Sequence, residues 1–341
     1  MTGSRWITGV AAALAFAASA TAALAAGAAL VEGSRFLRDG RPRVAEGVVL
    51  VGRVAPAAEV AGSRAYDAAR QRLDAGTFDA IRDYGADLVR FQVSQAGLDP
   101  EAAGHDPAYR GEVLAAVAEA RAAGFSVIVS MRKPLVRVGP DNMPTDVTRR
   151  AWGEIAGALA RDRGVLLELY NEPGLKERTP ENWAAWQRDM QSLIDLLRGA
   201  GAKNVLLVDG LRAAHYLGGS PPLRDPLGQL GYAVHPYLTA TNRTTEQWDR
   251  NFGDFARDHP VMATEFNARS ENGYCRESFP KEVDRLLGYL RARDIGLVVW
   301  AFDLPGVRRA DGTLSSYRNF ACGAGGDGGA GEAVHAYFLA H

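Results

Sequence analysis

Eight short apolar runs, rich in branched residues, recur along this chain and alternate with polar or helix-forming stretches. The runs cover residues 47–52, 87–93, 125–131, 164–170, 204–209, 232–235, 260–265 and 295–300. Strands of parallel sheets have this uninterrupted apolar composition because helices cover one face and a packed interior covers the other. Eight repeats of strand and helix are enough to close a sheet, so the sequence predicts an α/β fold with a (β/α)₈ barrel.

Helical stretches fill most of the spaces between these runs. The sequence predicts helices over residues 77–84, 112–123, 146–161, 180–199, 245–257, 280–293 and 332–339. Their ends carry the expected signals, because Gly124 follows the second helix and Thr179 precedes Pro180 at the start of the fourth. Two segments fit the alternation less well. Residues 211–230 contain a run of glycine and proline that interrupts any helix, and residues 36–47 are polar and predicted to form turns.

An open, doubly wound parallel sheet is the main alternative to a barrel. Such sheets commonly carry a glycine-rich dinucleotide turn after the first strand, but Gly52-Arg53-Val54-Ala55 lacks the second and third glycines of that motif. The length of 341 residues would also permit two domains. Because no linker interrupts the alternation, we expect residues 26–341 to form one catalytic (β/α)₈ domain.

The amino terminus has the features of a targeting segment. Arg5 is followed by an uncharged stretch from Trp6 to Val31, within which Ala23-Leu24-Ala25 offers a small-x-small cleavage pattern. We therefore predict a signal peptide over residues 1–25 and a secreted or periplasmic protein. The alternative is an uncleaved membrane anchor, which the alanine-rich composition disfavours. After cleavage, we expect a monomer with no stable membrane association.

The charge balance argues against nucleic acid as a partner. The chain has 39 Lys and Arg residues against 40 Asp and Glu residues, a formal net charge of -1. Proteins that bind nucleic acid concentrate positive charge on one face, and this balance predicts no such face. An uncharged ligand such as a sugar polymer is compatible with it.

Cys275 and Cys322 are the only cysteines of the sequence. In an exported protein, a lone pair of cysteines favours a disulfide. The two residues follow the seventh and eighth predicted strands, so their loops are expected at the same end of the barrel. Two unpaired thiols are the alternative. Neither cysteine has the spacing of a zinc ligand.

Polar and aromatic side chains gather where the predicted strands end. In a (β/α)₈ barrel, function is located at these carboxyl ends. The residues at these positions are Arg90, Asn171, Glu172, His235, Tyr237, Glu265 and Trp300. Glu172 and Glu265 are two carboxylates at two strand ends, as retaining glycoside hydrolysis requires.

These residues resemble the pattern of family 5 glycoside hydrolases, the cellulase-like members of a large clan of (β/α)₈ glycosidases. Asn171-Glu172-Pro173 matches the Asn-Glu-Pro motif after strand four, and His235-Pro236-Tyr237 matches the His-x-Tyr motif after strand six. Arg90, Glu265 and Trp300 match the family residues of strands two, seven and eight. An isolated Asn-Glu-Pro is a weak signal, whereas five matches in order at successive strand ends are specific.

The resemblance implies a role for each residue. Glu172 would donate a proton to the glycosidic oxygen and later accept one from water, while Glu265 would attack the anomeric carbon. Arg90 and Tyr237 would hydrogen-bond Glu265 and favour its charged form. The remaining residues would contact the sugar: Asn171 at the 2-hydroxyl group, His235 at a hydroxyl group or at the acid/base, and Trp300 by stacking. The resemblance implies no metal and no organic cofactor.

One position departs from the family pattern. The family usually has a His at the end of strand three, where this chain has Met131-Arg132-Lys133. Arg132 is therefore expected to occupy the space of that His, which affects a sugar contact and not the two carboxylates. Asp209 and Asp303 also follow strands and are expected to shape the cleft.

Each of these residues also has a plain structural interpretation. A Glu at a strand end can cap a helix or pair with an arginine, and Arg90 can be an ion-pair partner inside the barrel mouth. His235 can be a hydrogen-bonded core residue, and Trp300 can be ordinary core. Trp183 and Trp186 lie three apart on one helical face and are predicted to pack.

The sequence favours a secreted, retaining β-glycosidase that acts on a β-linked glucan or a related poly- or oligosaccharide. A β-mannanase or an exopolysaccharide-degrading glycosidase is a close alternative. A barrel that binds sugar without catalysis is suggested only by the missing His of strand three. A metal-dependent barrel hydrolase would need histidine ligands at strand ends, such as a pair after strand one, where this chain has Gly52-Arg53-Val54.

Overall fold

The structure is a computed structural model, and it describes residues 27–61, 70, 76–134, 142–268, 278–304, 306–309, 311–319 and 328–340. The predicted signal peptide over residues 1–25 lies outside the described residues. Cys275 and Cys322 also lie outside them, so their pairing stays a prediction.

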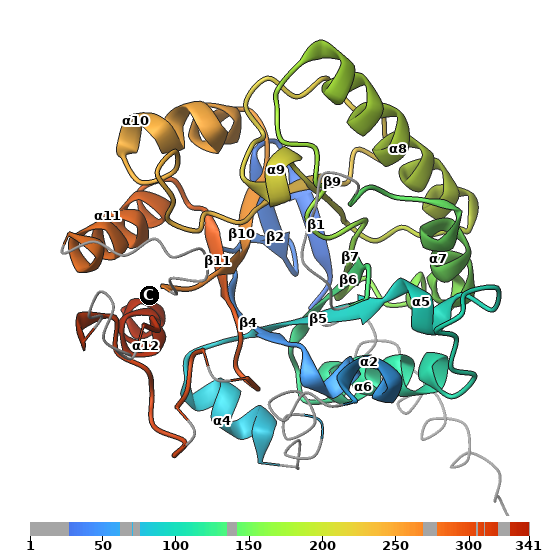
Figure 1. Cartoon of the computed structure of the whole chain (residues 1–341), viewed down its shortest axis with the longest axis horizontal. Coiled ribbons are helices and arrows are strands. Elements are labelled where there is room, and N and C mark those ends of the chain that lie inside the picture. Colours follow the sequence, from blue (N-terminus) through green and yellow to red (C-terminus); the bar gives the residue numbers. More distant parts are fainter. Residues whose placement is uncertain are drawn as a thin grey trace, which may run out of the picture.

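Eight parallel strands close into a barrel in the order β10-β11-β4-β5-β6-β7-β8-β9 (Figure 1). The strands are β4 (Glu46–Leu50), β5 (Leu88–Ser94), β6 (Ser126–Arg132), β7 (Val165–Glu168), β8 (Leu206–Asp209), β9 (Leu230–Val234), β10 (Val261–Phe266) and β11 (Gly296–Val299). Each strand pairs in parallel with both neighbours. The predicted (β/α)₈ barrel is confirmed, and the alternative of an open sheet is wrong.

Helices surround the barrel (Figure 1). The longer ones are α4 (Thr77–Asp83), α6 (Tyr109–Ala122), α7 (Asp146–Leu159), α8 (Pro180–Gly199), α11 (Phe279–Arg291) and α12 (Gly331–Leu339). Shorter pieces are η1 (Gly52–Val54), α2 (Ala57–Val60), α5 (Gln95–Leu98), α9 (Leu211–Ala214), α10 (Thr245–Trp248), η2 (Asp249–Gly253), η3 (Phe255–Arg257) and η4 (Tyr317–Asn319). The Thr179 hydroxyl group accepts from the Asn182 N–H and caps α8, with Pro180 in its first turn. None of the helices in the described part of the chain combines the length and hydropathy needed to cross a membrane.

The helix predicted over residues 245–257 is not continuous. It consists of α10, the π-helical turn η2 and the 3₁₀ turn η3. The physical reason is that the carbonyl oxygen of Asn251 accepts from the N–H groups of Leu217 and Gly218, at 2.7 and 2.8 Å. A carbonyl held by a neighbouring loop is withdrawn from the regular hydrogen-bond ladder of a helix, and the ladder shifts there.

Alternate residues of each strand face two different apolar clusters. Along β6, Val127, Val129 and Met131 pack in the layer between the barrel and the helices. Ile128 belongs to the second cluster, which fills the barrel interior together with residues such as Val49. This alternation fixes which polar residues of a strand point inward, because side chains two apart share a face.

A small antiparallel sheet lies at the amino end of the barrel, where only turns were predicted. It consists of β1 (Ala29–Glu32), β2 (Arg35–Arg38) and β3 (Arg41–Pro42), and β1 and β2 are visible within the ring of strands in Figure 1. The prediction of a polar, turn-rich segment over residues 36–47 did not include these strands. Strands of two to four residues carry little periodic signal. They are held here by contacts with the barrel, such as the Gln229 side chain on Val31.

Candidate active site

Arg90 lies at the centre of a buried polar network inside the barrel. Its Nε and Nη2 atoms donate to the two carboxylate oxygens of Glu168, at 2.8 and 2.6 Å. Nη1 donates to Glu265 Oε2 at 2.9 Å, and Nη2 also reaches Ser130 and Asn171. Burial alone would lower the pKa of Arg90, but the negative charges of Glu168 and Glu265 outweigh it and raise the pKa. The guanidinium therefore stays charged and organises both acids.

Three donors hold the Glu265 carboxylate. Oε2 accepts from Arg90 and from Gln92 Nε2 at 2.8 Å, and Oε1 accepts from the Tyr237 hydroxyl group at 2.9 Å. Burial and the neighbouring Glu172 raise the pKa of Glu265, whereas His235, Arg90 and Tyr237 act in the opposite direction. Hydrogen bonds to the charged form favour ionisation, so the three donors counter the cost of burying this carboxylate.

Glu172 has a φ of 58°, a left-handed backbone conformation that residues other than glycine rarely adopt. Two neighbours fix this conformation. The Glu172 N–H donates to Asp209 Oδ2 at 2.9 Å, and the Asn142 side-chain amide donates to the carbonyl oxygens of Asn171 and Glu172. Strained residues of this kind occur at functional sites, where the surroundings determine them from several sides.

His235 connects the two catalytic candidates. Its Nδ1 atom lies 3.1 Å from Glu172 Oε1, and its Nε2 atom lies 3.1 Å from the Thr264 hydroxyl group. Complete burial lowers the pKa of His235 to about 4, so the ring is neutral near pH 7. A neutral ring with its proton on Nδ1 donates to Glu172 and accepts from Thr264.

The carboxyl groups of the two glutamates lie close together at the carboxyl end of the barrel. A carboxylate oxygen of Glu172, one of Glu265 and a ring nitrogen of His235 all lie within 4.8 Å of one another. The Glu265 side chain is 8% exposed and that of Glu172 is 16% exposed. Both acids can therefore reach the same atom of a bound ligand from opposite sides.

Asp209 behaves differently from the other buried acids. Burial and the negative charge of Glu168 raise the pKa of Asp209 well above its usual range. Glu168 keeps a lowered pKa, because Arg90 outweighs the effect of burial. Of this pair, Asp209 is therefore the acid whose pKa is raised, and it positions the Glu172 loop by accepting its N–H group.

Two groups of side chains in the described residues have the composition of a metal site. They are Glu168 with Asp209 and His235, and Glu172 with His235 and Glu265. Both oxygens of Glu168 already accept from Arg90, and both oxygens of Glu265 already accept from protein donors. These ligand atoms are thus engaged by the protein's own donors.

Six of the seven predicted site residues belong to this one network: Arg90, Asn171, Glu172, His235, Tyr237 and Glu265. Trp300 directly follows β11 and packs partly buried against the cluster that fills the barrel. Its backbone N–H group donates to the carbonyl oxygen of Phe266 at 2.9 Å. The structure thus places Trp300 beside the strand that carries Glu265, and its stacking role stays a prediction.

The remaining strand-end residues hold loops. Asp303 accepts from the N–H groups of Val51, Gly52 and Arg53 and so fixes the turn after the first barrel strand. Burial raises the pKa of Asp303 to about 6. Arg132, at the end of β6, donates through Nη1 to Glu59 Oε2 and to the Lys133 carbonyl oxygen, both at 2.8 Å.

Five residues of the network were not predicted from the sequence: Gln92, Ser130, Asn142, Glu168 and Thr264. Gln92 lies two residues after Arg90 on the same strand face, and Glu168 is an acid within an otherwise apolar run, so both carried a signal. Thr264 directly precedes Glu265. Asn142 lies in a loop about 30 residues before Glu172, and no periodic pattern assigns such a residue to a site.

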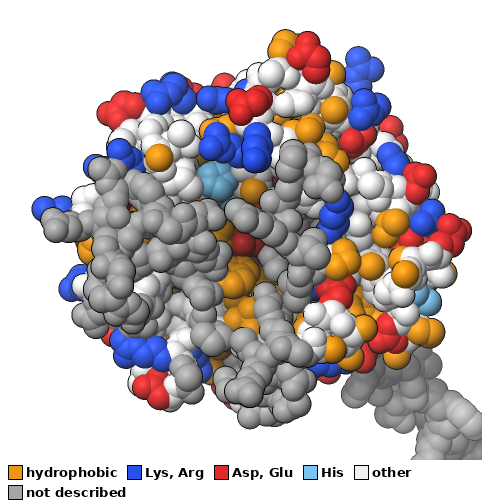
Figure 2. Space-filling view, in the orientation of Figure 1, with side chains coloured by type: hydrophobic (Ala, Val, Ile, Leu, Met, Phe, Trp, Pro, Cys, Tyr) orange, Lys and Arg blue, Asp and Glu red, His pale blue; other side chains and the backbone are white. Residues whose placement is uncertain are grey.

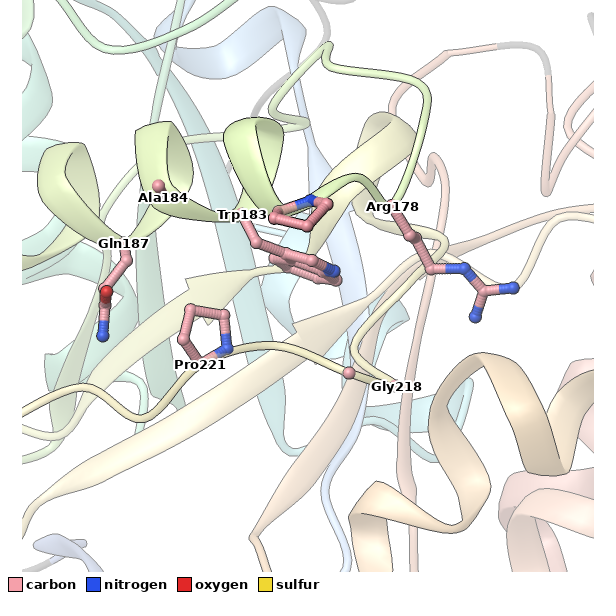
Figure 3. Close-up of a pocket in the computed structure, with 8 residues that line it drawn as sticks. Arg178, Trp183, Ala184, Gln187, Gly218 and Pro221 are labelled. Atoms are coloured by element: carbon pink, nitrogen blue, oxygen red, sulfur yellow. The ribbon is translucent and has the colours of Figure 1, made fainter.

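A hollow of about 620 Å³ lies at the same end of the barrel, between the first turns of α8 and the segment after α9. Figure 3 shows the Trp183 indole beside Pro221, with Arg178 and Gln187 to either side. Trp183 is 7% exposed and packs edge-to-face on the buried Trp186. This agrees with the prediction that both indoles pack. In Figure 2, acidic and basic side chains are interspersed around the described periphery of this face.

A (β/α)₈ barrel with two glutamates facing each other at its carboxyl end has the architecture of a glycosidase. The chain matches the cellulase family, glycosyl hydrolase family 5, over residues 57–304. It therefore belongs to this family of glycosyl hydrolases.

Relatives and solved structures agree with this assignment. The "Beta-mannanase/endoglucanase A" of Caldicellulosiruptor saccharolyticus is 24% identical over 246 residues, which is 68% of this chain and 17% of that protein. The catalytic domain of a Thermobifida fusca endoglucanase has a TM-score of 0.66 at 20% identity and covers 92% of this chain and 97% of its own. A β-glucanase of Saccharophagus degradans has a TM-score of 0.67 at 22% identity, with coverages of 92% and 94%. Both structures share the fold.

Proposed function

We propose that this protein hydrolyses a β-linked glucan or a related polysaccharide with retention of configuration, by double displacement. One observation carries the proposal: oxygens of Glu172 and Glu265 lie within 4.8 Å of each other. Carboxyl groups about 5 to 5.5 Å apart are typical of retaining glycosidases, whereas inverting ones leave about 6.5 to 9.5 Å for a water molecule.

In the first step, Glu265 attacks the anomeric carbon and forms an ester bond as the bond to the leaving sugar breaks. Glu172 gives its proton to the leaving oxygen. In the second step, the Glu172 carboxylate takes a proton from water. The water oxygen then bonds to the anomeric carbon, the ester bond breaks, and Glu265 leaves as a carboxylate.

The contacts of each glutamate support this division of roles. Arg90, Gln92 and Tyr237 all donate to Glu265, which favours the charged form that a nucleophile needs. Glu172 has a neutral histidine beside it and is the more exposed of the two acids. Greater exposure suits a group that exchanges its proton with a leaving oxygen and then with water.

The substrate class is inferred from the relatives. The Thermobifida fusca endoglucanase and the Saccharophagus degradans β-glucanase have both been solved with cellotetraose. A β-1,4-glucan is therefore the first substrate to test. A mannan is the second, because the name of the Caldicellulosiruptor saccharolyticus relative includes both activities. A polymeric substrate outside the cell also agrees with our inference that residues 1–25 direct export to a secreted or periplasmic location.

The test compares Glu265→Ala and Glu172→Ala with the wild type on an aryl β-glycoside that has a good leaving group. Each variant should lose activity by a factor on the order of 10⁴, as when one member of a catalytic unit is removed. Azide should restore turnover in both. It should yield the β-glycosyl azide with the Glu172 variant and the α-glycosyl azide with the Glu265 variant, because azide replaces a different group in each case.

Glucan and mannan panels then establish the natural class, and NMR of the first product records its configuration. An initial product of inverted configuration would contradict the double displacement. Binding of sugars without turnover by the wild type would favour the alternative of an inactive sugar-binding barrel.

A further inference from the structure

Arg132 takes the place where family 5 glycosidases usually have a histidine, and part of its side chain has no partner. The residue is 5% exposed. Its Nη1 atom donates to Glu59 and to the Lys133 carbonyl oxygen. Within the described residues, Nε and Nη2 are buried and make no hydrogen bond. Unpaired buried donors of a charged group are destabilising, so such groups in native proteins call for an explanation.

The unpaired atoms form one edge of the guanidinium, and this chain uses the same edge elsewhere to bind carboxylates. Arg90 holds Glu168 through Nε and Nη2 at 2.8 and 2.6 Å. Arg150 holds both oxygens of Asp99 at 2.8 Å, again through Nε and Nη2. Paired donors on this edge match the two oxygens of a carboxylate, which makes the contact strong and directional.

A second carboxylate on Arg132 has a precedent in the same barrel. Arg90 binds Glu168 with its Nε and Nη2 edge and binds Glu265 with Nη1 at the same time. Arg132 already holds Glu59 with Nη1, so its free edge corresponds to the edge of Arg90 that holds Glu168. One guanidinium between two carboxylates is thus an arrangement that this protein already contains.

The strand register places Arg132 on the inner face of the barrel at its carboxyl end, the end that carries the two glutamates. Ser130 faces the barrel interior, because its hydroxyl group accepts from Arg90. Arg132 lies two residues further along β6 and so shares the inner face, one step closer to the carboxyl end. The Asn171 N–H group donates to the carbonyl oxygen of Met131 at 2.7 Å, which brings the end of β6 beside the residue that precedes Glu172.

We propose that the Nε and Nη2 edge of Arg132 binds the carboxylate of an acidic sugar, so that the substrate is an anionic polysaccharide bearing uronate or similar carboxyl groups. The inference rests on the proposed glycosidase function and specifies its substrate class. The acidic residue occupies a position at or next to the cleaved bond. Neutral hydroxyl groups could also accept from this edge, but they lack the charge and the paired geometry that it matches.

The experiment uses matched pairs of polymers with the same backbone. One pair is a β-1,4-glucan and the same glucan after oxidation of its C6 hydroxyl groups to carboxylates. A mannan with its oxidised form and a xylan with a glucuronoxylan are the others. For each pair, kcat/KM is measured from the release of reducing ends, and the ratio of the acidic to the neutral member is the readout.

The wild type should favour the acidic member of at least one pair by about tenfold or more, and Arg132→Gln should bring this ratio close to one. Arg132→Lys keeps the charge without the paired edge and should retain only part of the preference. Arg188→Gln removes one charge from the exposed face of α8, where the side chain is 70% exposed, and should leave the ratio unchanged.

Two results would overturn the inference: no preference for the acidic member in any pair, or an acidic preference that Arg132→Gln leaves intact. Turnover of neutral polymers without acidic preference would leave the proposed glycosidase function standing. Failure to cleave any polymer would count against both. If Arg132→Gln unfolds because Glu59 loses its cation, the double variant Glu59→Gln/Arg132→Gln keeps the pair neutral and gives the same readout.

Discussion

At the scale of single residues, one buried cation, Arg90, compensates several carboxylates in the described part of the active centre. Arg90 is fully buried and donates to Glu168 and Glu265. A carboxyl oxygen of Asp209 lies within 4.8 Å of one of Glu168. Three carboxylates cannot all be charged around one guanidinium in a site that excludes water. The structure resolves this through Asp209, whose pKa is raised well above its usual range by burial and by Glu168.

The raised pKa of Asp209 predicts a specific pH dependence of stability. The native state keeps a proton on Asp209 that the unfolded chain releases above about pH 4. The stability that this proton contributes is complete below that pH and is lost as the pH rises through the native pKa. Compared with Asp209→Asn, which cannot ionise, the wild type should therefore lose about 1.4 kcal/mol of unfolding free energy per pH unit across this window.

Urea unfolding of both proteins at about pH 4.5, 6 and 7.5 measures this difference. Asp225→Asn is the matched control, because Arg198 overcomes the effect of burial and lowers the pKa of Asp225. Its difference from the wild type should be constant above about pH 4.5. A constant difference for Asp209→Asn as well would show that Asp209 is ionised in the native state.

At the scale of elements, the loop after β7 positions the acid/base candidate. The loop puts Glu172 at a φ of 58°, a conformation that costs about 1–3 kcal/mol and needs outside support. Asn142 supplies much of that support. Its side-chain amide donates to two loop carbonyl groups, and its Oδ1 atom accepts from the Tyr170 hydroxyl group at 2.8 Å. The segment before α7 thereby holds the loop that carries Glu172.

Asn142→Ala should reduce kcat more than it changes KM. Removing the amide frees the Glu172 carbonyl group and lets the backbone leave its strained conformation, so the carboxyl group is misplaced by a fraction of an ångström or more. We expect a roughly 10–100-fold loss in kcat and a loss of about 2–3 kcal/mol of stability from three side-chain hydrogen bonds.

Steady-state kinetics and urea unfolding give the two quantities separately. Asn182→Ala is the control, because it also removes an amide that donates to a loop carbonyl group, that of Glu177, but at an exposed site. Asn142→Asp keeps the acceptor for Tyr170 and loses only the amide donor, so it should reproduce the kinetic defect. Normal kcat in Asn142→Asp would mean that the amide does not position Glu172.

At the scale of the whole molecule, the small sheet β1–β3 closes the amino end of the barrel, opposite the active site. Phe36 of β2 lies against Gly231, where an added methyl carbon would come within 2.5 Å of the phenyl ring. Arg38 and Arg43 pair with Asp87, which precedes β5. The small sheet and the segment that follows it therefore cover the amino end of the barrel with the Phe36 ring and with ion pairs to Asp87. In (β/α)₈ barrels this end contributes to stability, whereas catalytic residues lie at the carboxyl end.

Phe36→Ala should lower stability without affecting turnover. The substitution opens a cavity between the small sheet and the barrel, and a partly buried ring should cost about 2 kcal/mol. Thermal and urea unfolding measure the loss, and kcat of the folded enzyme should change by less than about twofold. Arg35→Ala, at an exposed position of the same strand, should change neither quantity. A kcat loss equal to that of a site variant would contradict this separation.

The barrel and most of its active site could be predicted from the sequence because both depend on periodic or local patterns. Strand ends follow from the apolar runs, and parallel strands all end on one side, so Arg90, Glu172 and Glu265 could be placed together. Gln92 and Glu168 could have been predicted as site residues by the same reasoning, because both lie on predicted strands. Asn142 and the strands β1–β3 were not, because loop contacts and very short strands have no period.

What the sequence by itself determined is the eightfold alternation, the two glutamates and the family to which they belong. Only the tertiary structure decided which acids contact Arg90, that the pKa of Asp209 is the raised one, and that one edge of Arg132 makes no hydrogen bond within the described residues. The physical reason is that apolar periodicity is a property of neighbouring residues along the chain. Protonation and hydrogen bonding depend on distances between residues far apart in the chain, and these exist only once the barrel has closed.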